Sequence, residues 1–296
     1  MRGSNRYISF CALALLLRAT TTHAASTPIT HGTLELIAEN QWIEPGHEVY
    51  LGLHFQLENG WHIYWVNPGD SGEPPRVDWQ LPSGLTVGAT EWPTPHRLES
   101  PSIVDFGYES VVTLIMPMHV DRSLAAGQPI RVGAAMKLLV CSHEMCIPGK
   151  AQLSLALPVK SQPPPLDPRT ADLFVAARKS LPLATPKSWK LSVADTKDSF
   201  VITAKVGHQT RHAVFFPLSE SQIANAAPQN FVPLPGGFRL TLRKSDQLLK
   251  PIQRLQGVLA FSADRAYLID LPVGKSGAAS NSSDIGSAQF GSVQLQ

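Results

Sequence analysis

The chain has 296 residues and a nearly balanced charge, with 25 Lys and Arg, 23 Asp and Glu, and a formal net charge of +2 at pH 7. It carries no basic cluster, so nucleic acid is not among the expected partners. A chain of this length can bury one large core or two ordinary ones, and we expect two domains.

Residues 1–24 have the three parts of a secretory signal peptide. Arg2 and Arg6 form a basic region, residues 7–17 form an apolar one, and small residues lead to a cleavage point after Ala24 or Ala25. The apolar run falls well short of the roughly 20 residues that span a bilayer, and no later run approaches that length. We therefore expect a periplasmic or secreted protein without a stable membrane span.

Residues 28–160 show a β pattern throughout, with short apolar or alternating runs punctuated by Pro, Gly, Asn and Asp. Many short strands without alternating helices predict an antiparallel, immunoglobulin-like β-sandwich. Residues 67–110 form a long irregular section rich in Pro, Gly and Trp, and long loops of this kind are usually functional. The expected strands are 31–40, 48–58, 61–67, 111–120, 130–140 and 151–159.

A proline-rich stretch separates this region from a second one. Three consecutive prolines at 163–165 favour an extended spacer, and Asp167 as N-cap followed by Pro168 predicts one short helix. Further apolar segments predict a second β-sandwich over residues 165–273. The expected fold is therefore all-β, with two immunoglobulin-like antiparallel sandwich domains and one short helix between them. Residues 274–296 are rich in Gly, Ser and Gln, which is typical of a disordered tail.

Three cysteines occur, and Cys11 lies inside the predicted signal peptide. The mature chain keeps Cys141 and Cys146, in the segment LLVCSHEMCIPGK. They follow an apolar strand and precede IPGK, an expected turn, and a pair five positions apart around such a bend can come within disulfide range. In an oxidising compartment we expect them to form a bridge.

The spacing of this pair leaves three interpretations open. The first is a local structural disulfide, although closing so short a loop stabilises little in the chain-entropy model. The second is a soft-metal site, because Cys141, His143, Met145 and Cys146 are all ligand types for copper(I) or zinc. The third is redox exchange. The spacing differs from the C-x-x-C of thioredoxin-like sites, but a partner protein could reach the sulfurs at a strand end.

Five motifs are distinctive in combination, and four of them carry Trp, Pro or Cys. They are GWHIYWVNPGDSGEPPRVDW, LPSGLTVG, EWPTPHR, DFGYES and LLVCSHEMCIPG. Together they resemble the N-terminal periplasmic domain of the DsbD family of thiol:disulfide interchange proteins, and most closely the ScsB variant of the suppressor-of-copper-sensitivity branch. The resemblance covers roughly residues 30–160, and in that variant a second β domain follows. It implies a redox cysteine pair on an immunoglobulin-like sandwich and a link to copper tolerance.

The resemblance also implies roles for the two cysteines. Cys146 is expected to form the mixed disulfide with a partner, and Cys141 to resolve it. Family members continue into a multi-span membrane domain and a thioredoxin-like domain, which this sequence lacks, so we expect a separate membrane protein to donate electrons. The implied function is that of a thiol–disulfide oxidoreductase of the protein-disulfide reductase type. It needs no cofactor beyond the redox-active disulfide and acts on periplasmic thiol–disulfide proteins. The alternative is a copper-handling or partner-docking β-sandwich with metal-ligating or structural cysteines.

Four aromatic residues are nominated by the same resemblance. DFGYES is similar to the family's cap loop, which would place Phe106 and Tyr108 over the cysteines. GWHIYW is similar to the strand that supplies aromatic residues beside them, which nominates Tyr64 and Trp61.

Titratable residues near these motifs are further candidates. His62 and His96 could tune a thiolate, since a nearby cation favours it, although a lone His is more often an ordinary surface residue. Asp105 and Glu109 flank the expected cap and could relay protons.

Overall fold

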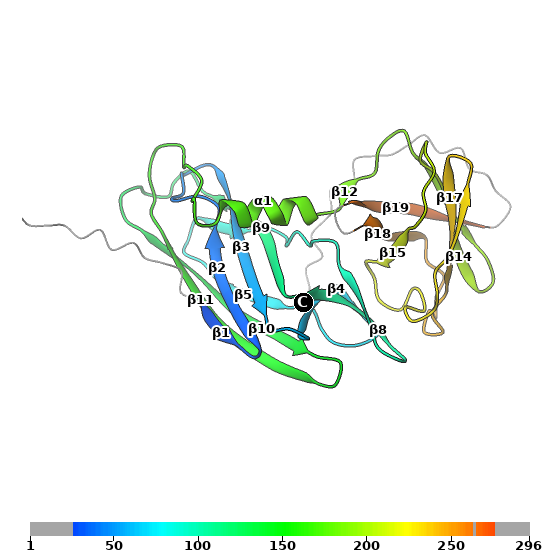
Figure 1. The fold of residues 1–296 in the computed structure, drawn as a ribbon. Helices are drawn as coiled ribbons and strands as arrows, with labels where there is room; N and C mark the ends of the chain where they lie inside the picture. Colours follow the sequence, from blue (N-terminus) through cyan, green and yellow to red (C-terminus); the bar gives the residue numbers. More distant parts are fainter. Residues whose placement is uncertain (1–25, 263–264, 276–296) are drawn as a thin grey trace, which may run out of the picture.

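The computed structural model describes residues 26–262 and 265–275, which form two β domains (Figure 1). The predicted fold class is confirmed, because the described chain is nearly all β with one short helix. The predicted signal peptide, Cys11 and residues 276–296 of the predicted tail lie outside the described residues. Residues 274 and 275, which we assigned to the tail, are instead the end of a strand.

The first domain has two sheets that share one buried core. One sheet has the strand order β1-β2-β3-β9-β6 and is antiparallel throughout. Strand β9 occupies the bounds predicted from its sequence. The strands are β1 (Thr27–Ile29), β2 (Gly32–Ala38), β3 (Glu48–Leu57), β6 (Leu85–Val87) and β9 (Val111–Val120).

The second sheet of this domain carries the cysteines. Its order is β11-β10-β4-β8-β7, and β5 also pairs with β10. Along β11, Leu153 and Leu155 are buried while Gln152 and Ser154 are exposed, the period-two pattern of a sheet with one covered face. The strands are β4 (His62–Gly69), β5 (Arg76–Gln80), β7 (His96–Glu99), β8 (Val104–Glu109), β10 (Ile130–Cys141) and β11 (Cys146–Leu157). Strands β5 to β8 lie in residues 67–110, so the section predicted to be irregular is only partly so, and the prediction missed these short strands.

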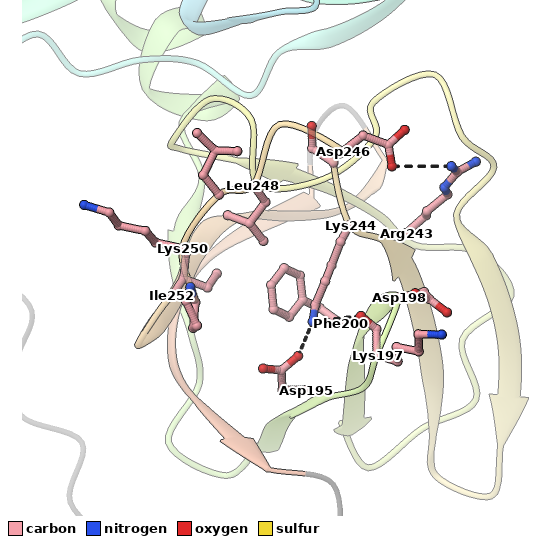
Figure 2. Close-up of a pocket in the computed structure, with 13 residues that line it drawn as sticks. Asp195, Lys197, Asp198, Phe200, Arg243, Lys244, Asp246, Leu248, Lys250 and Ile252 are labelled. Carbon is pink, nitrogen blue, oxygen red and sulfur yellow. Dashed lines mark hydrogen bonds and ion pairs between the residues drawn. The ribbon is translucent and has the colours of Figure 1, made fainter.

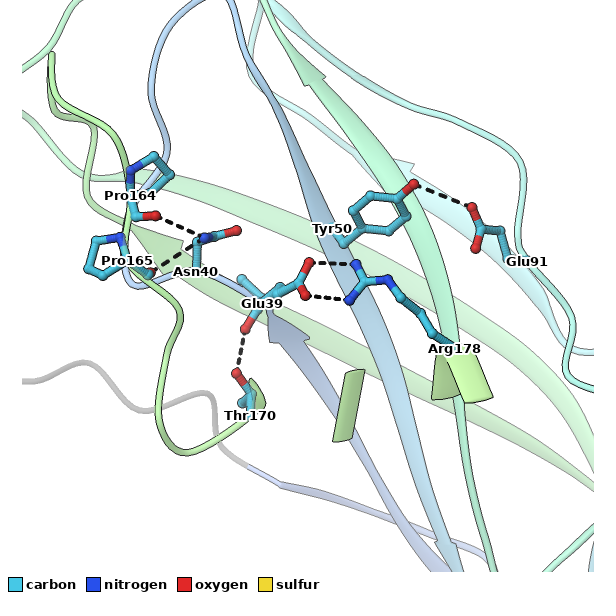
Figure 3. Close-up of polar contacts among 9 residues, drawn as sticks. Glu39, Asn40, Tyr50, Glu91, Pro164, Pro165, Thr170 and Arg178 are labelled. Carbon is cyan, nitrogen blue, oxygen red and sulfur yellow. Dashed lines mark hydrogen bonds and ion pairs between the residues drawn. The ribbon is translucent and has the colours of Figure 1, made fainter. Parts of the chain in front are cut away.

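The proline-rich segment between the domains is hydrogen-bonded along the first domain (Figure 3). The Nδ2 of Asn40 donates to the carbonyl of Pro164 at 3.2 Å, and the backbone N–H of Gln41 donates to the carbonyl of Pro165 at 3.1 Å. The predicted spacer is therefore held against the domain that precedes it.

Helix α1 (Ala171–Ser180) begins three residues later than predicted, with Thr170 as its N-cap. The side chain of Asp167, which we expected to cap the helix, instead accepts hydrogen bonds from Arg169 at 3.0 and 2.6 Å. At 10 residues α1 is too short to cross a membrane, and no other helix in the described part of the chain is a candidate.

One face of α1 packs on the first domain. Phe174 is fully buried in a cluster with Ile115 of β9. Figure 3 shows that Arg178 forms a bidentate ion pair with Glu39. The guanidinium of Arg178 also lies 4.7 Å from the centre of the Tyr50 ring. The helix that connects the two domains in the sequence is thus fixed to the first.

The second domain is a curled sheet with the order β15-β18-β19-β13-β14-β17-β16, and β12 also pairs with β19. Strand β19 pairs antiparallel with β18 but in parallel with β13 and β12, unlike the purely antiparallel arrangement that we expected. The two halves of the sheet pack over one core that includes Phe200, Phe238 and Leu259. The strands are β12 (Leu183–Ala184), β13 (Lys190–Asp195), β14 (Ser199–Lys205), β15 (Val214–Pro217), β16 (Asn230–Leu234), β17 (Gly237–Arg243), β18 (Arg254–Ser262) and β19 (Arg265–Lys275).

The two domains share an aromatic contact. Phe216 of β15 meets Trp65 of β4 and Phe106 of β8 edge to face, with ring centres 6.3 and 5.3 Å apart. Beside it, the Nδ2 of Asn67 donates to the carbonyl of Pro217 at 2.8 Å. The second domain therefore packs directly on the strands that contain most of the GWHIYW and DFGYES motifs.

A polar contact continues this interface. The Nδ2 of Asn225 donates to Asp70 at 2.9 Å, and the carbonyl of Asn225 accepts from the guanidinium of Arg97 at 3.1 Å. The other carboxylate oxygen of Asp70 accepts from the backbone N–H of Val104, the first residue of β8, at 2.8 Å. The second domain thus fixes the start of a strand whose next residue lines the cavity described below.

Candidate functional site

The two mature cysteines close the β10–β11 hairpin. The N–H of Ser142 donates to the carbonyl of Met145 at 2.8 Å across the turn. Because hydrogen-bonded and non-hydrogen-bonded pairs alternate along an antiparallel ladder, Cys141 and Cys146 form the next, non-hydrogen-bonded pair, whose side chains approach more closely. The predicted bridge is confirmed: a disulfide joins them, with Cα atoms 4.1 Å apart. The turn predicted at IPGK was wrong, since residues 147–150 lie in β11.

The two sulfur-bearing residues differ in access to solvent. Cys141 is 0% exposed, although it lies on the face of β10 opposite the core residues Leu138 and Val140, whereas Cys146 is exposed at the start of the edge strand. An incoming sulfur can therefore approach Cys146 far more easily than Cys141, because thiol–disulfide exchange needs direct access to the attacked or attacking atom.

A cavity of about 200 Å³ opens beside Cys146. It is bounded by β4 and the segment after it, by β7, β8 and the bend between them, and by the hairpin turn. Its lining residues are His62, Tyr64, Ser71, Leu98, Ser100, Ile103, Asp105, Ser142, His143, Glu144, Met145 and Cys146. The structure thus gathers titratable, hydroxyl and apolar side chains around the accessible sulfur.

Tyr64 is the protein group in direct polar contact with that sulfur. Its phenol donates a hydrogen bond to the Sγ of Cys146 over 3.4 Å, since a disulfide sulfur has no proton to give. The Tyr64 side chain is fully buried, and burial raises the pKa of its phenol. The hydroxyl therefore stays protonated at neutral pH and remains a donor to the sulfur.

His62 stands beside the other cysteine. It is paired directly with Cys141 in the β4–β10 ladder, and its ring meets that of Tyr64 edge to face with centres 5.2 Å apart. Burial, with a smaller contribution from the nearby charge of His143, lowers the pKa of His62 to about 4. Its buried Nε2 makes no hydrogen bond within the described chain.

Asp105 of β8 is the buried carboxylate among the residues that line the cavity. Its two oxygens accept hydrogen bonds from the backbone N–H and the hydroxyl of Ser71, both at 2.8 Å. Burial raises the pKa of Asp105, and these two bonds partly offset that effect. Glu109, the other proposed relay, is exposed and lies opposite His62 in the β4–β8 ladder.

The remaining nominated aromatic residues do not line the cavity. Phe106 is buried in the aromatic contact between the domains, and Tyr108 is buried with its hydroxyl donating to the carbonyl of Pro93 at 2.7 Å. Trp61 stacks on His31, with ring centres 3.6 Å apart. The expected cap loop is strand β8 here, and its aromatic side chains serve the core and the domain interface.

Half of the twelve lining residues were not nominated from the sequence, namely Ser71, Leu98, Ser100, Ile103, Ser142 and Glu144. Leu98 and Ile103 supply an apolar wall on either side of the bend between β7 and β8, and Ser71 holds Asp105. Their positions depend on how short strands pair across residues 67–110, a pairing that no local pattern announces. His96, a sequence candidate, is exposed on β7 and does not line the cavity.

The residues of the alternative metal site lie close together in the sequence, but the structure does not arrange them as a set of metal ligands. The two cysteines are bonded to each other, and His143 and Met145 are exposed on the turn, Met145 by 53%. In the described ranges, no group of three or more His, Cys, Asp or Glu side chains is placed to hold a metal ion.

A larger cavity, of about 590 Å³, lies at one end of the second domain (Figure 2). Four of its charged groups form two ion pairs: Lys244 lies 2.5 Å from Asp195, and Arg243 lies 3.6 Å from Asp246. Lys244 also donates to the carbonyl of Thr196 at 2.6 Å. The cavity contains neither thiol nor imidazole, so the cysteine cavity is the better candidate for chemistry.

Comparison with known proteins agrees with this choice of site. Residues 34–158 match the family model of the N-terminal domain of thiol:disulfide interchange protein DsbD. Among solved structures, the N-terminal periplasmic domain of ScsB from Proteus mirabilis matches with a TM-score of 0.63 and 17% identity, over 85% of this chain and 100% of that one. That likeness shows a shared fold.

Two further structures overlap only loosely. One is a protein of unknown function from Porphyromonas gingivalis W83, with 14% identity and a TM-score of 0.22, over 81% of this chain and 98% of that one. The other is domains 5-6 of the S-layer protein SbsC, with 8% identity and a TM-score of 0.20, over 86% of this chain and 100% of that one. No curated protein matches the chain in sequence. Residues 34–158, which hold the disulfide and its cavity, thus match the family of N-terminal domains of thiol:disulfide interchange protein DsbD.

Proposed function

We propose that this protein is a periplasmic protein-disulfide reductase that passes electrons from the Cys141–Cys146 dithiol to oxidised partner proteins. A separate membrane protein reduces the pair again. The family of residues 34–158 and the disulfide at the mouth of a cavity support thiol–disulfide chemistry.

The observation that carries the proposal is the difference in exposure between the cysteines. The exposed Cys146 attacks the partner disulfide and forms the mixed disulfide, and the buried Cys141 then attacks Cys146 and releases the reduced partner. Two electrons leave the dithiol and two partner sulfurs are reduced. A disulfide with a purely structural role would not need one sulfur to be accessible.

A trapping experiment tests the proposal. An oxidised thioredoxin-fold protein is the probe, and the reduced Cys141→Ala variant should accumulate a mixed disulfide with it, because the resolving thiol is missing. Cys146→Ala is the matched control and should trap none, since its remaining thiol is buried. Adducts on Cys141 alone would reverse the two roles. Adducts on neither, together with a reduction potential below about −300 mV, would show a structural bridge instead.

A further inference from the structure

His62 is the ionisable group that lies beside the resolving sulfur. It is opposite Cys141 in the ladder, and Cys141 is opposite Cys146. Directly opposed residues of an antiparallel pair share a face, with Cβ atoms roughly 4.5–5.5 Å apart. The imidazole therefore neighbours Cys141, while Tyr64, two residues further along the same face of β4, contacts Cys146.

The thiol of Cys141 must lose its proton before it can attack, and solvent cannot accept that proton directly. The attacking species in exchange is the thiolate, and burial disfavours it. Cys141 is 0% exposed, so water has no direct access to its proton. A buried base with a free lone pair beside it would supply the missing acceptor.

His62 meets these conditions better than its neighbours do. It is only 6% exposed, and its Nε2 has no hydrogen-bond partner within the described chain. Asp105, by contrast, accepts two bonds from Ser71. The titratable groups that face His62 from the elements around it are Tyr64 of β4, Asp105 and Glu109 of β8, and His143 and Glu144 of the turn. The last three are exposed.

We propose that His62 is the base for Cys141, and that its Nε2 takes the thiol proton when the mixed disulfide on Cys146 is resolved. The S–H bond of Cys141 breaks and its proton moves to the imidazole. The sulfur then attacks the Sγ of Cys146, the bond from Cys146 to the partner breaks, and the partner leaves as a thiolate that recovers a proton from the imidazolium. Cys141 and Cys146 become a disulfide, and the partner sulfur is reduced.

The low pKa of His62 applies to the disulfide form, in which the ring is neutral at pH 7 and its lone pair is free. A thiolate formed beside the ring would favour the imidazolium, so reduction of the disulfide should raise the pKa of His62. This expectation supplies a measurement on the wild-type chain.

The inference rests on the proposed function for its biological use, but its test needs no protein partner. Reduced full-length protein is mixed with excess dithiobis(nitrobenzoate), and release of thionitrobenzoate is followed over time. Cys146 releases the first equivalent in a bimolecular phase. Attack by Cys141 on the mixed disulfide releases the second in a phase that is independent of reagent concentration.

His62→Gln should slow the second phase about 100-fold at pH 7, the usual order for loss of a general base, and should leave the first phase unchanged. The two proteins should converge at high pH, where hydroxide removes the proton. His96→Gln, a histidine on the exposed side of β7, is the matched control and should behave as the wild type. An unchanged second phase, or equal slowing at every pH, would overturn the inference.

An NMR titration of the His62 ring in the wild type covers the case in which the variant does not fold. The pKa of the ring should rise when the disulfide is reduced, and should stay low in the reduced Cys141→Ala variant. Equal values in the oxidised and reduced wild type would refute the role of His62. If these results hold but no protein partner is trapped, the proposed function fails and the assignment of His62 stands.

Discussion

Replacing Phe216 by alanine should loosen the attachment of the second domain to the wall of the cysteine cavity. The side chain is 4% exposed and is the aromatic group of β15 that lies against Trp65 and Phe106. Truncation of a buried Phe to Ala costs about 3 to 5 kcal/mol. We expect about 3 to 4 kcal/mol, because two domains can shift to close part of the space left behind.

Phe215→Ala is a matched control from the adjacent position. Phe215 points to the opposite face of β15 and is fully buried in the core of the second domain alone. Both variants should lose similar stability in denaturant titrations, but in different places.

Hydrogen exchange of the full chain, read by mass spectrometry, separates the two effects. A loss of about 3 to 4 kcal/mol corresponds to exchange about 100- to 1,000-fold faster wherever protection depends on the lost contact. Phe216→Ala should accelerate exchange in β4, β8 and β15, whereas Phe215→Ala should spare β4 and β8. If Phe216→Ala leaves β4 and β8 protected, the interface does not support the cavity wall, and the reasoning is refuted.

Three other changes have defined outcomes. In the wild type, the pKa of His62 is about 4 in the folded chain and 6.5 in the unfolded chain, so the unfolded state binds more protons between these two pH values. The free energy of unfolding should therefore fall by about 3 kcal/mol as the pH drops from 6.5 to 4. His62→Gln should remove this part of the pH dependence. Urea titrations from pH 7 to 4 measure the difference, and parallel curves would contradict it. Tyr64→Phe removes the phenol that donates to the Sγ of Cys146 over 3.4 Å. Because a donor favours the reactive thiolate, alkylation of Cys146 by iodoacetamide at pH 7 should slow several-fold in the Cys141→Ala background. An equal or faster rate would contradict this prediction. Arg178→Ala should destabilise by about 1 to 2 kcal/mol by thermal unfolding, through loss of the Glu39 pair and the Tyr50 contact, whereas Val175→Ala on the exposed side of α1 should change little.

The longer strands could be predicted because burial of one face imposes a visible period on their sequence. Val111–Val120 forms a strand with the predicted bounds, and the first sandwich follows from several such segments. Strands β5 to β8 have three to six residues each, and β5 pairs with β10, more than fifty residues away in the sequence. Their register is decided by distant partners, which a local pattern does not record.

The turn assigned to IPGK shows a second limit of sequence signals. Pro followed by Gly usually marks a turn, yet Pro148 lies exposed in β11, the edge strand of its sheet. An edge strand has one unpaired side, so a residue without an N–H can be accommodated there. The turn is instead at residues 142–145, where the sequence contains neither Gly nor Pro.

Only some residues of the candidate site could be predicted from the sequence, and their arrangement could not. Cys141, Cys146 and Tyr64 were all nominated, but the sequence did not distinguish His62 from His96. Only the pairing of His62 with Cys141 makes that distinction. Phe106 illustrates the opposite case, because its burial depends on Phe216, more than a hundred residues later.

The ladder between β10 and β11 has a consequence for turnover. Each strand has 12 residues, and the pairing continues from Ile130 opposite Leu157 to the cysteines themselves. These contacts do not depend on the sulfur–sulfur bond, so reduction should leave both thiols at neighbouring positions. Cys141 then meets a mixed disulfide on Cys146 at the high effective molarity of a fixed intramolecular group. Partners would accordingly be held only briefly, and the lifetime of the covalent complex would depend on proton removal rather than on a search by the second thiol.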